Sequence, residues 1–183
     1  MLVERFANFA RPVLDLPYVR RTRRNHGLEH ATIHILSERV KNLRMAGRSS
    51  DGGFILLGEA PTEQVETAVR DALRRMRAGE HGLAVHPNCG TNLVTTGLLA
   101  SLAAMIGLAG ASRRDSFNRL PTVMTLIMVT LIFSPALGMS LQKFITTDGD
   151  PADLEVVSIR RSEMQTPLSA SPLTVHRVVT HSS

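Results

Sequence analysis

The chain has 183 residues, enough for one domain with a sizeable core, and its hydrophobic fraction of 43% is ordinary for a soluble protein. That average hides a segregation of charge, because residues 92–110 and 120–142 carry none. Of the 21 Lys and Arg residues 14 precede Thr91, against 10 of the 16 Asp and Glu residues. A basic front suits anionic lipid headgroups or nucleic acid. With one Tyr and no Trp to stack on bases, we expect lipid and no nucleic acid.

Residues 1–24 form a basic, amphipathic segment that ends in the arginine run of residues 20–24. The run is either a solvated basic turn or a collar that binds lipid headgroups. Early charges and the lack of a continuous apolar core exclude a secretory signal in this segment.

A second segment, residues 25–91, is predicted to form a small helical and β domain. Apolar residues at helical spacing predict a helix over 26–46, which Gly47 ends. A glycine turn at 52–53 then precedes a short buried strand at 54–57. Thr62 is expected to cap an amphipathic helix that stops near Gly79.

The uncharged stretches 92–110 and 120–142 are each long enough to cross about 30 Å of hydrocarbon as a helix. A short connector makes residues 92–142 an antiparallel transmembrane hairpin, and a pair of buried helices in a soluble protein is the alternative. Small residues four apart would let the two helices approach closely. These pairs are Gly97/Ser101, Ala100/Ala104 and Ala103/Gly107.

The tail, residues 143–183, contains two segments that alternate apolar and polar residues, 154–161 and 173–180. They predict a β-hairpin or small sheet, with a connection that contains Pro167, Ser169, Ser171 and Pro172. Disorder of this tail is the alternative. The expected fold class is therefore an α+β membrane protein.

His26, Glu29 and His30 carry the first chemical signal. Their spacing of three and four residues puts them on one face of a helix. Two imidazoles and a carboxylate suit zinc or another divalent transition metal. The same string matches the HxxEH pattern of inverzincin peptidases, in which Glu29 would be a general base on metal-bound water.

The second signal is the turn of residues 86–92, which carries His86 and Cys89. It precedes the first apolar helix, where exposed N–H groups favour a thiolate at Cys89. Asn88 or Thr91 is expected to cap that helix. We expect the two motifs to bind one metal through His26, Glu29, His30, His86 and Cys89, with Glu29 as the alternative catalytic residue.

HGLEH followed by HPNCGTN resembles the paired motifs HGxEH and HPxCGT of uncharacterised bacterial membrane proteins, some regarded as metal-dependent enzymes. The resemblance extends from about Arg24 to Gly110. It implies a metal site but no particular reaction.

Two functions remain open on sequence alone. One is a membrane protein with a closed metal site, which would join complex subunits or a second copy of itself. The other is a zinc-dependent hydrolase with an open metal position. We expect a multi-pass protein of the inner membrane with both termini in the cytoplasm, because an unsignalled basic domain is hard to translocate.

Overall fold

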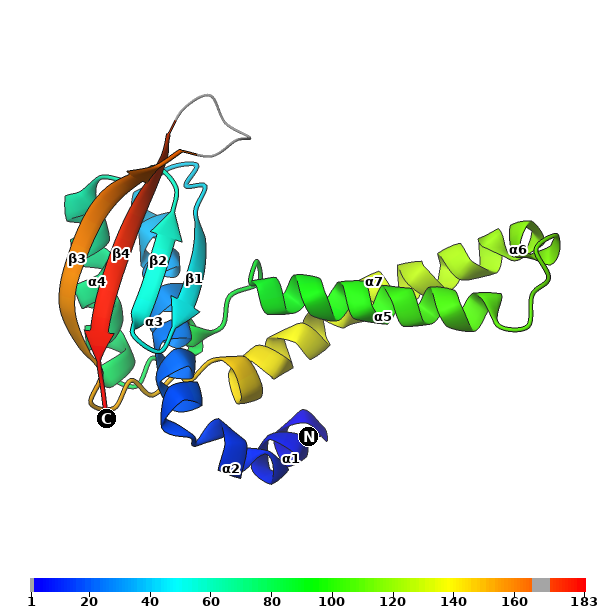
Figure 1. Ribbon diagram of the computed structural model, residues 1–183, viewed down its shortest axis with the longest axis horizontal. Coiled ribbons are helices and arrows are strands. Elements are labelled where there is room, and N and C mark those ends of the chain that lie inside the picture. Colours follow the sequence, from blue (N-terminus) through cyan, green and yellow to red (C-terminus); the bar gives the residue numbers. More distant parts are fainter. Residues whose placement is uncertain (1, 166–171) are drawn as a thin grey trace. The chain divides into compact units, whose positions relative to one another are not determined.

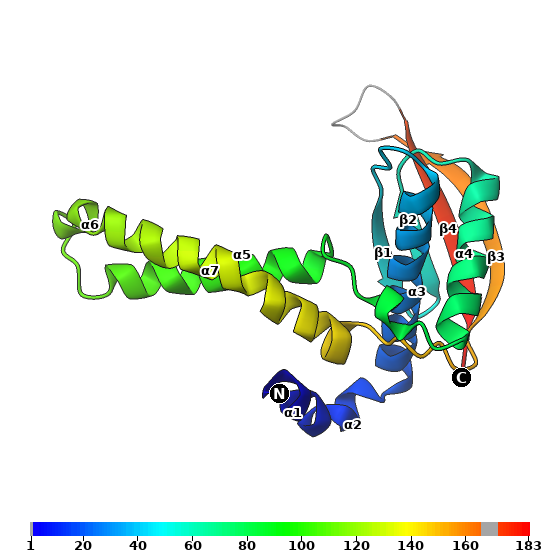
Figure 2. The same cartoon turned by 180° about the vertical axis from the view of Figure 1, so that it is seen from behind.

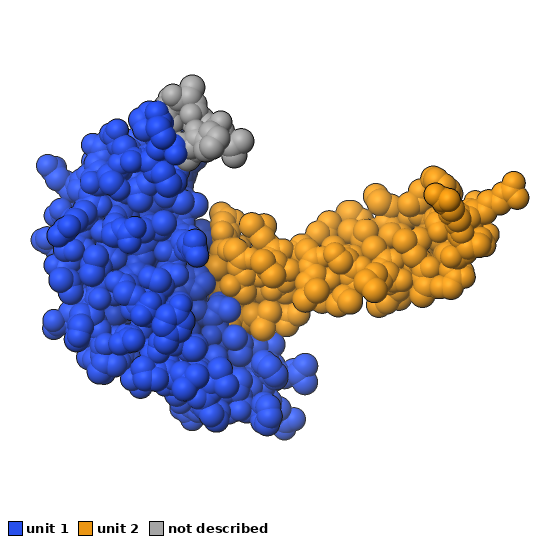
Figure 3. Space-filling model, in the orientation of Figure 1, with its two compact units in different colours: residues 1–86, 143–183 blue, residues 87–142 orange. Residues whose placement is uncertain are grey.

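The computed structural model describes residues 2–165 and 172–183. It divides into two compact units, which Figure 3 colours separately: residues 1–86 with 143–183, and residues 87–142. We refer to them as unit 1 and unit 2.

The elements of unit 1 come from both ends of the chain. They are α1 (Leu2–Phe9), α2 (Arg11–Leu14), α3 (Pro17–Arg39), β1 (Ala46–Ser50), β2 (Gly53–Leu57), α4 (Thr62–Arg77), the 3-10 turn η1 (His81–Ala84), β3 (Glu155–Met164) and β4 (Leu173–His181). Unit 2 holds α5 (Gly90–Leu108), α6 (Asp115–Asn118) and α7 (Leu120–Leu141), and the π-helical turn η2 (Gln142–Thr146) continues α7 across the boundary.

Unit 1 is an antiparallel four-stranded sheet in the order β1-β2-β4-β3, with α3 and α4 covering one face (Figures 1 and 2). Alternation along β4 explains the arrangement. His176 and Val178 are buried on the covered face, whereas Arg177 between them is exposed. Leu28, Leu36, Val69 and Met76 fill the space between the helices and the sheet.

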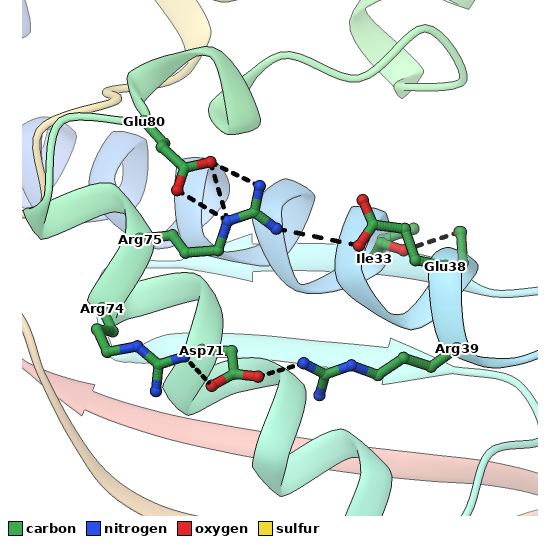
Figure 4. Close-up of polar contacts among 8 residues, drawn as sticks. Ile33, Glu38, Arg39, Asp71, Arg74, Arg75 and Glu80 are labelled. Atoms are coloured by element: carbon green, nitrogen blue, oxygen red, sulfur yellow. Dashed lines mark hydrogen bonds and ion pairs between the residues drawn. The ribbon is translucent and has the colours of Figure 1, made fainter.

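Salt bridges supplement the apolar contact of α3 with α4 (Figure 4). Arg39 of α3 pairs with Asp71 of α4, and Arg74 also reaches Asp71 at 2.7 Å. The Arg39 guanidinium holds the pKa of the Asp71 carboxyl below its ordinary value. One further turn along α4, Arg75 binds Glu80 at 2.6 Å.

The expected elements are largely present, with three corrections. The first helix begins at Pro17 and ends at Arg39, so the arginine run forms helical turns and not the basic turn that we considered. Proline at the first position of a helix loses no hydrogen bond, which suits Pro17 to that start. Residues 46–50 form β1 at the edge of the sheet, where we expected the helix to end and predicted no strand. Thr62 is the first residue of α4 and Pro61 is its N-cap, so Thr62 does not take the capping position that we expected.

The two strands predicted in the tail are β3 and β4, and β4 lies between β2 and β3 inside the sheet. The tail is therefore part of the same sheet as the front segment. Pro167, Ser169 and Ser171, which we placed in the connection between the strands, lie outside the described residues.

Unit 2 is an antiparallel pair of helices, α5 and α7. Thr96 and Ser134 form a hydrogen bond between them at 2.8 Å. Of the small-residue pairs, Ala103 and Gly107 are buried, and a Cβ at Gly107 would meet Val123 of α7. Gly97 has open space around its Cα and Ser101 is exposed, so that pair makes no close helix contact.

By length and composition, residues 90–108 and 120–146 are helices that could cross a membrane. This test alone is weak, because a buried helix of a soluble protein also passes it. In the most apolar windows of these two helices, however, only 22% and 11% of the residues are buried.

Asn25 of α3 is fully buried and links three elements. Its Nδ2 donates to the carbonyls of Ser50 (2.8 Å) and Asp51 (3.2 Å), and its Oδ1 accepts from Thr180 Oγ1 (2.7 Å). One side chain therefore attaches the helix to β4 and to the end of β1.

We predict that Asn25→Ala lowers the free energy of unfolding by roughly 2–3 kcal/mol, because it leaves buried polar groups without partners. Thermal unfolding of the full chain in detergent, followed by circular dichroism, measures this. Thr22→Ala is the control, since the Thr22 hydroxyl bonds the Tyr18 carbonyl of its own helix and, among residues 2–165 and 172–183, no other group. Equal stabilities of the two variants would contradict the role given to Asn25.

Candidate metal centre

Four imidazole rings lie side by side in unit 1. The ring centroids of His26 and His30 are 4.4 Å apart, and His86 lies 5.8 Å from His30 and 4.7 Å from His34. Three of the rings come from successive turns of α3, and His86 follows η1. The structure thus brings together the histidines of both sequence motifs, and it adds His34, for which the motifs assigned no role.

Backbone carbonyls determine the tautomers of three of these rings. In His34 the atom that faces a carbonyl is Nε2, which lies 3.0 Å from the Val85 oxygen and therefore carries the proton. In the other two rings it is Nδ1. His26 Nδ1 lies 2.9 Å from the Thr146 carbonyl oxygen, and His30 Nδ1 lies 2.8 Å from that of Ala84. A carbonyl only accepts hydrogen bonds, so each Nδ1 must carry the proton. In a neutral imidazole this leaves the lone pair on Nε2, the atom that would bind a metal. Metal-binding histidines commonly have such a carbonyl partner.

The carbonyl partners come from segments far away in the chain. Arg23 holds the segment that contains Thr146: its Nε donates to the Ile145 carbonyl (2.8 Å) and its Nη2 to that of Thr147 (3.1 Å). Gly27 lets both segments approach α3, because a Cβ there would overlap the Asp148 carbonyl and press against Ala84. Arg23 and Gly27 therefore position the carbonyls that orient the histidines.

The Glu29 carboxylate is directed at β1. It accepts a hydrogen bond of 2.5 Å from Ser49 Oγ, and a Cβ at Gly47 would overlap it. Burial raises the pKa of Glu29 above its ordinary value, while the Ser49 hydrogen bond and nearby His26 oppose the rise. The contacts of Glu29 are thus with β1. A carboxyl whose pKa is raised toward neutral pH is better suited to transferring protons than one that is always ionised.

His86 is held in its neutral form. Burial and the neighbouring rings of His34 and His30 lower its pKa to about 4. A neutral imidazole is the form that binds metals, so the surroundings of His86 suit a ligand.

Cys89 follows His86 by three residues and is the N-cap of α5, where its sulfur accepts from Thr91 N at 3.4 Å. The cysteine therefore takes the capping position that we expected of Asn88 or Thr91.

The chain belongs to the family named Domain of unknown function (DUF6391). The match covers residues 21–159, which include the four histidines, Glu29 and Cys89. An uncharacterised protein of Picosynechococcus sp. strain PCC 7002 is 33% identical over 138 residues, 68% of this chain. The matched region is 65% of that relative's length. No solved structure matches the chain. The expectation of an uncharacterised family is confirmed, and neither comparison gives a reaction.

Sequence reasoning missed the residues that orient the site. Arg23 looked like one of several surface arginines, and Asn25 carried no motif. His34 was visible as one further turn along the same helical face.

We predict that chelator-treated protein loses stability as the pH falls from about 6.5 to about 4. The unfolded chain, with an ordinary histidine pKa of about 6.5, binds more protons in this window than the folded chain, where the pKa of His86 is about 4. The contribution of His86 to the free energy of unfolding is therefore complete above the histidine pKa of the unfolded chain, and it is lost as the pH falls toward the pKa of the folded chain.

Thermal midpoints at neutral pH and near pH 5 measure this effect. His86→Gln should reduce the difference between the two midpoints, whereas the exposed His81→Gln should not. An unchanged difference in His86→Gln would show that other groups cause the acid sensitivity.

Proposed function

We propose that this protein is an integral membrane metal-binding protein in which His26, His30 and Cys89 hold one divalent transition metal. The observation that carries the proposal is that His26 and His30 each place Nδ1 against a backbone carbonyl. Each Nδ1 therefore carries the proton, and each Nε2 keeps its lone pair for the metal. Nitrogen and sulfur donors favour zinc over magnesium or calcium.

The chain itself keeps Cys89 within reach of the histidines. Three residues span at most about 10 Å, so the thiol cannot lie far from His86, whose ring contacts His30. His86 is the fourth donor in this proposal. Four protein ligands close a tetrahedral site, which favours a structural over a catalytic metal.

The membrane part of the proposal rests on α5 and α7. Their length, their apolar composition and the small buried share of their residues favour a bilayer over a protein core. Pairing of β2 with β4 joins the flanks of the two helices in one sheet, so both flanks belong on one side of the membrane. In this proposal α5 and α7 cross the inner membrane. Unit 1 lies in the cytoplasm, and the α5–α7 connector lies on the opposite side of the membrane.

A second function is a zinc-dependent hydrolase, possible only if His86 does not bind and water takes its place. The observation that favours it is Glu29, a buried carboxyl with a raised pKa. In that function Glu29 would act as the general base, which agrees with its absence from the ligand set proposed here.

Metal content per chain tests the site. Wild-type protein purified without chelator should contain about one zinc per chain, and His30→Ala or Cys89→Ala should contain almost none. His81→Ala is the control and should keep the metal. A fully folded, metal-free wild type would contradict both functions.

Glu29→Gln separates the two functions in the same experiment. The variant should keep its metal, because a glutamine oxygen can still accept from Ser49. Cleavage of casein by the wild type and not by this variant would establish the hydrolase. Loss of metal from Glu29→Gln would instead make Glu29 a ligand.

A reporter fused after Asp115 tests the topology. We predict that alkaline phosphatase at this position is active and that a fluorescent protein is dark, since the connector would lie outside the cytoplasm. Fusions after Ser183 should give the reverse result. A fluorescent fusion at Asp115 would overturn the orientation.

A further inference from the structure

The face of the sheet that α3 and α4 do not cover carries a row of arginines. Register places Arg48 of β1 opposite Ile55, Ile55 opposite Arg177 of β4, and Arg177 opposite Arg160 of β3. All three arginines are exposed. Among the described residues, none of the three makes an ion pair or a side-chain hydrogen bond.

The rows on either side contain no acidic residue. One consists of Ala46, Leu57, Val175 and Ser162, and the other of Ser50, Gly53, Val179 and Ser158. Twelve positions on the open face thus hold three positive charges, three hydroxyls and no carboxylate. Like charges directly opposite one another destabilise a sheet, so the fold alone gives no reason for Arg160 to face Arg177.

A depression of about 290 Å³ lies on this face. Arg48, Ser50 and Arg177 line it, and Tyr18 of α3 reaches it as well. Arg48 and Arg177 are two strands apart, roughly 10 Å, and their long side chains can converge over Ile55. Two guanidinium groups and two hydroxyl groups then surround one space.

We propose that this face binds a phosphate-bearing ligand, held between Arg48 and Arg177 and attracted also by Arg160. Guanidinium groups match phosphate oxygens in pairs, and a phosphate placed there would screen the repulsion along the row. The ligand is either a phospholipid headgroup or a soluble phosphate. Nucleic acid fits less well, because the twelve positions carry no aromatic side chain for base stacking.

This site does not depend on the metal. It also differs from the arginine run in which we expected headgroups to bind. There Arg23 and Arg24 bind carbonyls near residue 145 and the Asp153 carboxylate, so those two side chains serve the fold. The arginines of the sheet face, in contrast, have no such partners within the part of the chain that the structure describes.

The test uses full-length protein in uncharged detergent and phosphate-free buffer. Calorimetry measures its affinity for inorganic phosphate, for short-chain phosphatidylglycerol and for the matching phosphatidylcholine. We expect binding that the double variant Arg48→Gln/Arg177→Gln weakens on the order of tenfold or more. Arg113→Gln/Arg114→Gln removes two exposed arginines of the α5–α7 connector and should bind as the wild type does.

The probes distinguish the two sources of phosphate. Binding of phosphatidylglycerol alone assigns a lipid headgroup, and comparable binding of inorganic phosphate assigns a soluble ligand. The proposal is overturned if no probe binds, if the double variant binds like the wild type, or if oligothymidylate binds more tightly than both phosphate probes. If the double variant does not fold, the affinity of Arg177→Lys is measured instead. This variant keeps the positive charge but loses the paired donors of the guanidinium group. An affinity equal to that of the wild type would again overturn the proposal.

Discussion

Hydrogen bonds from the side chains of α3 to distant backbone determine the arrangement of unit 1. Within twelve residues, Arg23, Asn25, His26, His30 and His34 each bind backbone carbonyls of other segments. Apolar packing alone would allow a helix to rotate or slide on a sheet. Directed bonds to three separate segments fix the rotation of α3, and with it the face on which the histidines lie.

Fold and site therefore share the same bonds. The Ala84 carbonyl that orients His30 belongs to η1, and the Thr146 carbonyl that orients His26 follows α7. A change in either segment would turn an imidazole as well as loosen the packing. Conversely, a ligand on the two Nε2 atoms would strengthen the attachment of both segments to α3, since binding that occurs only in the folded state adds to its stability.

Local pattern was sufficient for much of this fold. Apolar spacing predicted α4, alternation predicted β3 and β4, and uncharged length predicted α5 and α7. The edge strand β1 was missed because Ala46–Ser50 lacks the β-branched and aromatic residues of typical strands. This segment is a strand because it pairs with β2, a contact that its own sequence does not reveal. The spacing of His26 and His30 indicated a shared face, but no local signal shows that Glu29 turns toward Ser49 or that carbonyls 54 and 120 residues away orient the rings.

The place of β4 in the sheet has a consequence for the order of synthesis. Its partner β2 leaves the ribosome early, whereas β4 emerges only after both helices of unit 2 have been made. During that interval β2 is paired on one side only, and its other edge is open to pairing with foreign strands. Under the proposed membrane topology, the two helices would be available for insertion before the sheet closes. Removing the nine residues of β4 would separate β3 from the rest of the sheet, an effect unlike the trimming of a flexible end.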